Sequence, residues 1–158
     1  MVKINLKAES KISFPKGTKV LFTDPCYIFS HSISKEMDQA WGDMCYEMFS
    51  NEGREKDLNN SGTIELDGVK VMYSGTAHGD GYYSVNTKLP KGGNGVGVDA
   101  GLICVCDYEE ALKIHNNPNY IMGEVVELVE DTTFVVDGDS RSYGMIRNIN
   151  ETIVLDTE

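Results

Sequence analysis

The chain lacks any long apolar run. No stretch approaches the roughly 20 apolar residues that a membrane-spanning helix requires. Residues 1–7 alternate between apolar and polar or charged side chains, so they also lack the apolar centre of a signal peptide. These two absences predict a cytoplasmic protein that does not associate with a membrane.

Positive charge is also scarce. The chain has 14 Lys and Arg against 25 Asp and Glu, which gives a formal net charge of −11. Residues 1–23 carry five lysines and one acid, whereas residues 107–158 carry twelve acids and three basic residues. A phosphate backbone is held by clustered Lys and Arg, so this composition argues against direct nucleic-acid binding. It suits solubility, a basic protein partner or mimicry of nucleic acid.

Cysteine is present only at positions 26, 45, 104 and 106. An even count allows disulfides, but a chain with a sizeable apolar core does not need them. We therefore expect four reduced thiols, with Cys104 and Cys106 buried in a strand. This pair lacks the second Cys or His pair of a zinc site, so the sequence predicts no metal or other cofactor.

The length of 158 residues and the hydrophobic fraction of 41% are typical of one globular domain, residues 1–158. A helix is predicted over 34–49, because Ser34 can cap it and an apolar stripe follows at Met37, Trp41, Met44 and Met48. Asp107 is typical of a residue that caps a second, short helix over 107–114.

Strand patterns dominate the remainder. Two alternating runs, 63–66 and 69–73, flank an Asp-Gly pair and predict a hairpin. An apolar strand is expected over 96–106, broken at residues 99–101, and a meander over 122–129, 132–136, 143–149 and 152–155. Residues 50–62 and 90–95 are rich in Gly and polar side chains and predict loops. The fold class is α+β, with a mostly antiparallel sheet that is curled or barrel-like.

Three polar turns place an aspartate where an apolar strand ends or bends. They are residues 24–27 (D-P-C-Y), 78–82 (H-G-D-G-Y) and 98–101 (V-D-A-G). Turns at one end of a sheet lie near each other, so Asp24, Asp80 and Asp99 are expected to converge. The alternative is that each aspartate only bonds its own backbone, as turn aspartates commonly do.

If the turns converge, they form a site that can hold a ligand. The carboxylates and His78 would accept hydrogen bonds or bind a hard metal ion, and the tyrosines would stack on a planar ring. The predicted ligand-binding residues are Asp24, Tyr27, His78, Asp80, Tyr82 and Asp99.

The motifs D-P-C-Y (24–27), G-T-A-H-G-D-G-Y-Y (75–83) and V-D-A-G-L-I (98–103) resemble those of a loose group of small uncharacterised proteins from bacteria, phages and prophages. The G-D-G-x-Y turn is also similar to one in a broader bacterial domain family of unknown function. The resemblance covers residues 20–106. It implies a β-rich fold and origin in a mobile element, and no established activity.

We expect a binding protein rather than an enzyme. In a phage setting it would act in counter-defence in the host cytoplasm, either sequestering a small nucleotide-like ligand or blocking a basic surface of a host protein. Few Lys and Arg lie near the turns, which argues against a highly phosphorylated ligand.

Two alternatives stay open, and so does the oligomeric state. One is a hydrolase that uses a metal held by the same carboxylates, or Cys26 as nucleophile. Against the thiol mechanism, Cys26 is expected in a Pro-containing turn rather than at a helix start. The other alternative is a structural or scaffold component whose aspartate turns are only turns.

Overall fold

The structure is a computed structural model that describes residues 4–30, 34–115, 122–138 and 143–158. The described helices are α1 (Cys26–Phe29), α2 (Lys35–Met48), α3 (Asn51–Glu55) and α4 (Tyr108–Ile114). The strands of the first half are β1 (Ile4–Lys7), β2 (Lys11–Phe14), β3 (Lys19–Thr23), β4 (Ser61–Leu66), β5 (Val69–Gly75) and β6 (Gly81–Tyr83). Those of the second half are β7 (Val85–Thr87), β8 (Lys91–Gly93), β9 (Val96–Val98), β10 (Leu102–Asp107), β11 (Gly123–Glu127), β12 (Thr132–Asp137), β13 (Met145–Asn148) and β14 (Ile153–Asp156).

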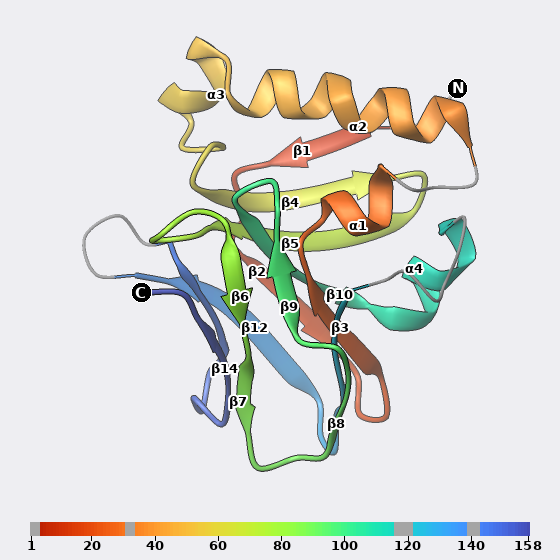
Figure 1. Ribbon diagram of the computed structural model, residues 1–158, viewed down its shortest axis with the longest axis vertical. Coiled ribbons are helices and arrows are strands. Elements are labelled where there is room, and N and C mark those ends of the chain that lie inside the picture. The colour runs from red at the N-terminus through yellow and green to blue at the C-terminus, as the bar shows by residue number, and fades with distance from the viewer. Residues whose placement is uncertain (1–3, 31–33, 116–121, 139–142) are drawn as a thin grey trace.

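A seven-stranded antiparallel sheet forms the middle layer, in the order β1-β4-β5-β10-β3-β11-β8 (Figure 1). Near its centre, β10 pairs with β5 on one side and β3 on the other, so that Cys104 lies opposite both Tyr73 and Thr23. Residues 102–106 are all buried, because both faces of this strand are covered. Of the apolar run predicted over 96–106, residues 102–106 therefore form an internal strand of this sheet, whereas residues 96–98 form β9, which pairs with β6.

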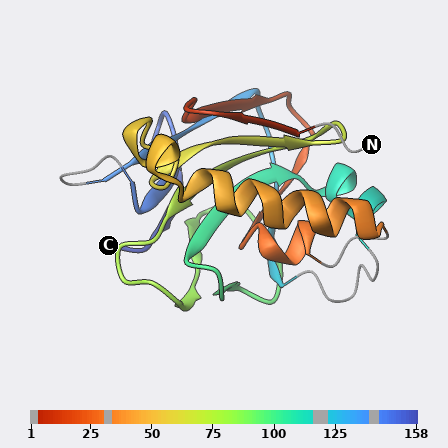
Figure 2. The same cartoon turned by 90° about the horizontal axis from the view of Figure 1, so that it is seen from above.

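Helices cover one face of the seven-stranded sheet, and Figure 2 shows α2 lying along it. The main helix begins as predicted, since Ser34 Oγ accepts a hydrogen bond of 3.3 Å from Met37 N. Its predicted stripe is buried, and Trp41 stacks on Phe29 of α1 with ring centroids 5.5 Å apart. Of the described helices, none combines the length and the apolar character needed to cross a membrane.

Side chains of the seven-stranded sheet alternate between two apolar cores. Cys104 and Cys106 face the helices, whereas Ile103 and Val105 of the same strand face the second sheet. Both cysteines are buried, as expected, and all four cysteines of the chain are free thiols. The middle layer is therefore apolar on both faces, which explains why its strands lack a simple alternation of apolar and polar residues.

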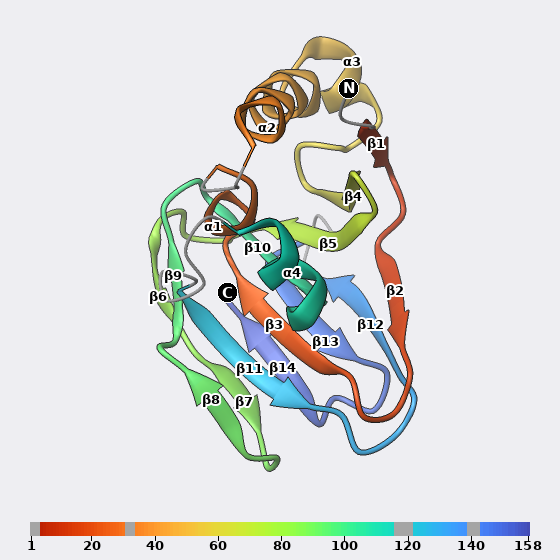
Figure 3. The same cartoon turned by 90° about the vertical axis from the view of Figure 1, so that its right-hand side faces the viewer.

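A five-stranded antiparallel sheet, in the order β2-β12-β13-β14-β7, forms the third layer (Figure 3). Phe134 of β12 joins the sheets through an edge-on contact with Phe22 of β3, at a centroid distance of 5.6 Å, and it also contacts Phe14 of the neighbouring β2 at 6.0 Å. The α+β class and both predicted helices are confirmed. The barrel-like shape is not found: in the described part of the chain the sheets are stacked and not closed into a barrel, because the strands divide between two layers.

Segment 81–98 connects the two sheets along one side. Its β7 adds to the five-stranded sheet beside β14, and its β8 adds to the seven-stranded sheet beside β11. Between these layers, β6 and β9 pair with each other, and Figure 1 shows them side by side. One hairpin therefore ties both layers together, and two of the predicted aspartate turns lie at its ends.

Residues 50–62 do not form the predicted loop, because they contain α3 and the start of β4. Ser50 Oγ caps α3 by accepting a hydrogen bond of 3.1 Å from Gly53 N. One helical turn is too short to show an apolar period, and its polar, Gly-containing composition is typical of loops. The same reasoning missed β8 within residues 90–95, where Lys91 and two glycines pair with β11.

Candidate functional site

The site begins at Asp24, directly after β3, a strand buried on both faces. This side chain is fully buried. Its Oδ1 accepts a hydrogen bond of 2.9 Å from Cys26 N, and its Oδ2 accepts bonds of 3.0 and 2.7 Å from Asp99 N and Ala100 N. One carboxylate therefore ties the start of α1 to the 98–101 turn, although the two segments are far apart in the chain.

Burial raises the pKa of Asp24 above its ordinary value, and the N–H donors of Ala100, Cys26 and Asp99 oppose that rise only in part. A buried carboxylate needs such donors, because it has no water to accept hydrogen bonds from. These three bonds all come from backbone groups, and the side chain is not accessible. Asp24 therefore positions the site rather than contacting a ligand.

Tyr27 and Asp99 form the accessible part of this junction. The hydroxyl of Tyr27, in α1, donates a hydrogen bond to Asp99 Oδ2. Asp99 is exposed, whereas Tyr27 is half-buried. Because Asp24 holds the backbone of residue 99 in place, the Asp99 carboxylate is presented to solvent in a defined position. Of the three aspartates predicted to converge, Asp24 and Asp99 are therefore brought together, and Tyr27 contacts Asp99.

Asp80 and Tyr82 reach the same region through the β6–β9 ladder. Gly81 is opposite Val98, so Asp80 and Asp99 leave the ladder at the same end. Tyr82 is 67% exposed and lies opposite Gly97. Its hydroxyl oxygen would be 2.4 Å from a Cβ placed on Gly95, so the ring lies directly against the glycine backbone next to β9.

Gly97 lies opposite Tyr82 in the ladder and close to the Tyr27 hydroxyl. A Cβ on Gly97 would be 3.9 Å from the Tyr27 hydroxyl. Directly opposite residues in an antiparallel pair project to the same side, so this Cβ would lie on the same face of the ladder as the Tyr82 side chain. We call Tyr27, Asp80, Tyr82 and Asp99 the rim cluster. It offers two exposed carboxylates and an exposed aromatic ring at one end of a hairpin.

His78 is placed less favourably than predicted. It is exposed, in a turn organised by its neighbour: the Gly79 carbonyl accepts hydrogen bonds from Thr76 Oγ1 (2.8 Å) and the Tyr83 hydroxyl (3.1 Å). Within the described part of the chain, His78 makes no hydrogen bond or ion pair of its own. His78 is two residues before Asp80 in the chain, and no hydrogen bond or ion pair in the described residues joins it to Asp80 or Asp99.

The surroundings do not favour a metal centre or a thiol nucleophile. Among the described residues, no three His, Cys, Asp or Glu side chains are grouped so that they could hold a metal ion. The prediction that Cys26 lies in a Pro-containing turn and not at a helix start is wrong. Cys26 is the first residue of α1, a single helical turn that follows Pro25. Burial and the nearby Asp24 charge raise the pKa of its thiol well above its ordinary value, whereas a nucleophilic cysteine needs a lowered pKa.

An ionic cluster around the buried Glu124 side chain lies beneath the hairpin, and sequence reasoning missed it. Glu124 of β11 is 5% exposed; its Oε1 accepts a hydrogen bond of 2.9 Å from Ser84 Oγ, and its Oε2 is 3.0 Å from Lys91 Nζ. Lys91 also donates to the Val85 carbonyl at 2.7 Å. The signal in the sequence is a glutamate at an inward position of a strand, which requires a partner. The cluster fixes the hairpin to the middle layer.

Comparison with protein-family models, curated proteins and solved structures finds no match for this chain. The resemblance of its three motifs to bacterial and phage proteins therefore stays a prediction. Function has to be argued from the geometry of the rim cluster itself.

Proposed function

We propose that the protein is a non-enzymatic binding protein whose rim cluster takes a small nucleoside-like molecule. The observation that carries this proposal is the positioning of Asp99 by Asp24 and Tyr27, which holds an exposed carboxylate in one place before any ligand arrives. Preorganised polar groups beside an aromatic surface are the usual composition of a small-molecule site.

The chemistry of the rim cluster favours a planar ligand that donates hydrogen bonds. Asp80 and Asp99 can accept bonds from amino and hydroxyl groups, and the exposed ring of Tyr82 can stack on a base. Cations that would bind phosphate are scarce here. Lys91, one of the two lysines nearest in sequence to the turns, is already paired with Glu124. The ligand is therefore a nucleoside or a weakly charged nucleotide derivative.

This proposal changes the roles of two predicted ligand-binding residues. Asp24 becomes a positioning residue because it is buried and fully engaged with backbone N–H groups. His78 stays a predicted contact that no interaction in the described chain supports. In a phage setting, sequestration of such a ligand would serve counter-defence. A basic host protein as partner of the acidic residues 107–158 stays a prediction of the sequence.

Calorimetric titration with adenosine, guanosine, cytidine and uridine, and with their 5′-monophosphates, tests the proposal. At least one nucleoside should bind, and its monophosphate should bind more weakly because the rim cluster is anionic. Asp99→Asn and Tyr82→Ala should each weaken binding about tenfold or more, from loss of a charged hydrogen bond or of stacking area.

Matched controls distinguish these effects from general surface changes. Tyr46→Ala removes an 83% exposed tyrosine on α2, and Glu47→Gln neutralises an exposed acid beside it. Both controls should bind like the unmodified protein. Recovery of the bound nucleoside unchanged after denaturation is expected of a binding protein. Failure of all eight compounds to bind, or tighter binding of the monophosphates, would contradict the proposal.

A further inference from the structure

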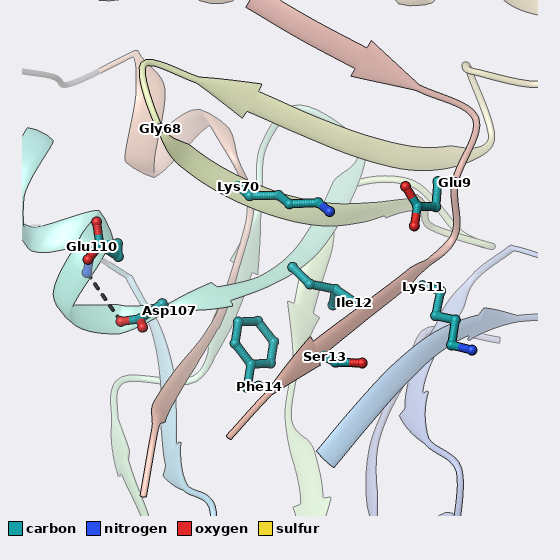
Figure 4. A pocket seen from close by; sticks show the side chains of 9 residues that line it. All are labelled: Glu9, Lys11, Ile12, Ser13, Phe14, Gly68, Lys70, Asp107 and Glu110. Atoms are coloured by element: carbon teal, nitrogen blue, oxygen red, sulfur yellow. Dashed lines mark hydrogen bonds between the residues drawn. The ribbon is translucent and has the colours of Figure 1, made fainter. Parts of the chain in front are cut away.

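Figure 4 shows a groove of about 620 Å³ beside β2, which is separate from the rim cluster. Its lining combines acids and lysines, such as Glu9, Asp107 and Lys70, so its charges favour no one class of ligand. None of the residues that line it belongs to the rim cluster. The contacts that bear on the rim cluster are instead those of a buried threonine, Thr157, which directly follows β14.

The hydroxyl group of Thr157 joins two segments of backbone. The side chain is 2% exposed. Its Oγ1 donates a hydrogen bond to the Gly144 carbonyl and accepts one of 3.1 Å from Ala77 N. A hydroxyl group has a single proton to donate. Because Gly144 engages that proton, the lone pairs of the oxygen are left to accept the Ala77 N–H. Thr157 therefore holds residue 77, although 80 positions separate them in the chain.

Gly144, the other partner of the Thr157 hydroxyl, is itself fixed. Its carbonyl also accepts a hydrogen bond of 2.9 Å from Thr157 N, and its N–H donates one of 2.8 Å to Ser74 Oγ of β5. Ser74 is fully buried. A Cβ on Gly144 would be 3.6 Å from the Ala77 Cβ, so residue 77 also packs against this backbone. The hydroxyl is therefore presented to Ala77 from a buried and hydrogen-bonded position.

Ala77 belongs to the turn formed by residues 76–80, which carries Asp80. Thr76 Oγ1 donates a hydrogen bond of 2.8 Å to the Gly79 carbonyl, across this turn. The bond encloses Ala77 and ends at the residue before Asp80, so a movement of Ala77 is transmitted to Asp80. A contact that fixes Ala77 therefore restrains the backbone of Asp80 as well.

The same turn is joined to the one that carries Asp99. Thr76 N donates a hydrogen bond of 3.2 Å to the Gly101 carbonyl. Gly101 is two residues after Asp99, in the turn that the buried Asp24 holds. Each exposed carboxylate of the rim cluster therefore has a buried anchor of its own, and Thr157 is the second one. The two anchors together restrain how far apart the carboxylates lie.

We propose that Thr157 is a positioning residue of the rim cluster, because it holds the Asp80 carboxylate where a bound nucleoside requires it. The ligand in this inference rests on the proposed function, whereas the restraint of the turn does not. Ala77 is exposed, so without the Thr157 hydroxyl its N–H bonds to water and the turn loosens. A ligand then has to order the turn as it binds, which weakens binding.

Amide hydrogen exchange tests the restraint without any ligand. Thr157→Val removes the hydroxyl and keeps the branched shape, whereas Thr157→Ser keeps the hydroxyl. The Ala77 N–H should exchange about fivefold faster in Thr157→Val and at the unmodified rate in Thr157→Ser. Thr132→Val is the matched control, because Thr132 is also buried and its hydroxyl also donates to a backbone carbonyl, that of Glu130. It should leave exchange at Ala77 unchanged.

A double-mutant cycle tests whether Thr157 acts through Asp80. Calorimetry uses whichever of adenosine, guanosine, cytidine and uridine binds the unmodified protein most tightly. Thr157→Val should weaken binding about fivefold, and Thr157→Ser and Thr132→Val should stay within about twofold of the unmodified protein. Added to Asp80→Ala, Thr157→Val should change the affinity less than about twofold, because the contact that it positions is already lost. Added to Asp99→Asn, it should still cost the full factor.

The outcomes separate this inference from the proposed function. An unchanged exchange rate at Ala77 in Thr157→Val would show that the hydroxyl does not restrain the turn. Equal losses of affinity with and without Asp80→Ala would show that Thr157 does not act through Asp80, even though a nucleoside binds. If none of the four nucleosides binds, the proposed function and the role of Thr157 in ligand binding fail together, whereas the exchange rates still decide the restraint.

Discussion

Asp24 and Asp99 carry the same side chain in two different environments. Asp24 is fully buried and accepts three backbone N–H groups, whereas Asp99 is exposed and accepts the Tyr27 hydroxyl. The sequence identifies both as turn aspartates that follow apolar strands. It does not distinguish them, because the donors for Asp24 come largely from a turn about 75 positions further along the chain. The residue types of the site were predictable from the sequence. Which aspartate positions the backbone and which one is exposed to a ligand was not.

Asp24→Asn should destabilise the protein by about 1–3 kcal/mol, since a buried acceptor is replaced by a donor. The amide nitrogen of asparagine would face either Cys26 N–H or the N–H groups of Asp99 and Ala100. Urea unfolding of both proteins measures the difference. An unchanged urea midpoint would show that the hydrogen bonds of Asp24 make no net contribution to the free energy of unfolding.

The same pair of proteins should differ in pH dependence. Because burial raises the folded-state pKa of Asp24 above the ordinary value of 3.8, the folded state binds the proton more tightly than the unfolded state. The contribution of Asp24 is then fully present below that ordinary value and declines as the pH rises through the folded pKa. The difference in unfolding free energy between the unmodified protein and Asp24→Asn should therefore shrink as the pH rises above the ordinary value of 3.8.

At the scale of single elements, length decided what the sequence could predict. The helix α2 is long enough for its apolar residues to repeat over three turns. The turn at Asp67 and Gly68 has positive φ angles of 50° and 89°, and an Asp-Gly pair is the composition that predicts such angles. In contrast, α1 and α3 have four and five residues, too few for a period. They are held by tertiary contacts, such as the stacking of Phe29 on Trp41, that no local pattern records.

Two glycines in neighbouring helices should respond in opposite directions to alanine. A Cβ on Gly53 would lie 2.3 Å from the Glu47 carbonyl oxygen, so Gly53→Ala should destabilise the protein by about 1–3 kcal/mol. Gly42, within α2, has nothing within 4 Å of that position, and Gly42→Ala should stabilise by about 0.5–1 kcal/mol. Thermal unfolding followed by circular dichroism compares them. Equal shifts in one direction would contradict the close approach of α3 to the end of α2.

For the whole molecule, the sequence predicted the α+β class but not the allocation of strands to sheets. The composition of each strand shows which of its residues are apolar, and none shows which strand it pairs with. Residues 11–14 pair with β12, more than 110 positions later, and β1 just before them belongs to the other sheet. The rim cluster depends on this arrangement, because segment 81–98 is held by both sheets.

Phe134→Ala should lower stability by about 3–5 kcal/mol, because Phe134 is fully buried and contacts two aromatic rings between the sheets. The chain has a single tryptophan, Trp41, which lies in the helical layer on the opposite face of the middle sheet. Since both cores share that sheet, Trp41 fluorescence should report the same lowered midpoint as circular dichroism. A fluorescence midpoint that stays unchanged would mean that the helical layer unfolds separately.

The late position of β12 in the chain has a consequence for biosynthesis. As a nascent polypeptide leaves the ribosome from its N-terminal end, β1, β3, β4, β5 and β10 can assemble among themselves, whereas residues 11–14 have no strand to pair with until residues 132–137 emerge. During that interval Ile12 and Phe14, together with Phe22 and Val105 on the sheet they later cover, are open to water. Such exposed surface invites aggregation. A ribosome that pauses before residue 132 would therefore carry a chain whose five-stranded sheet has not formed. This is the stage of synthesis at which a chaperone would be needed most.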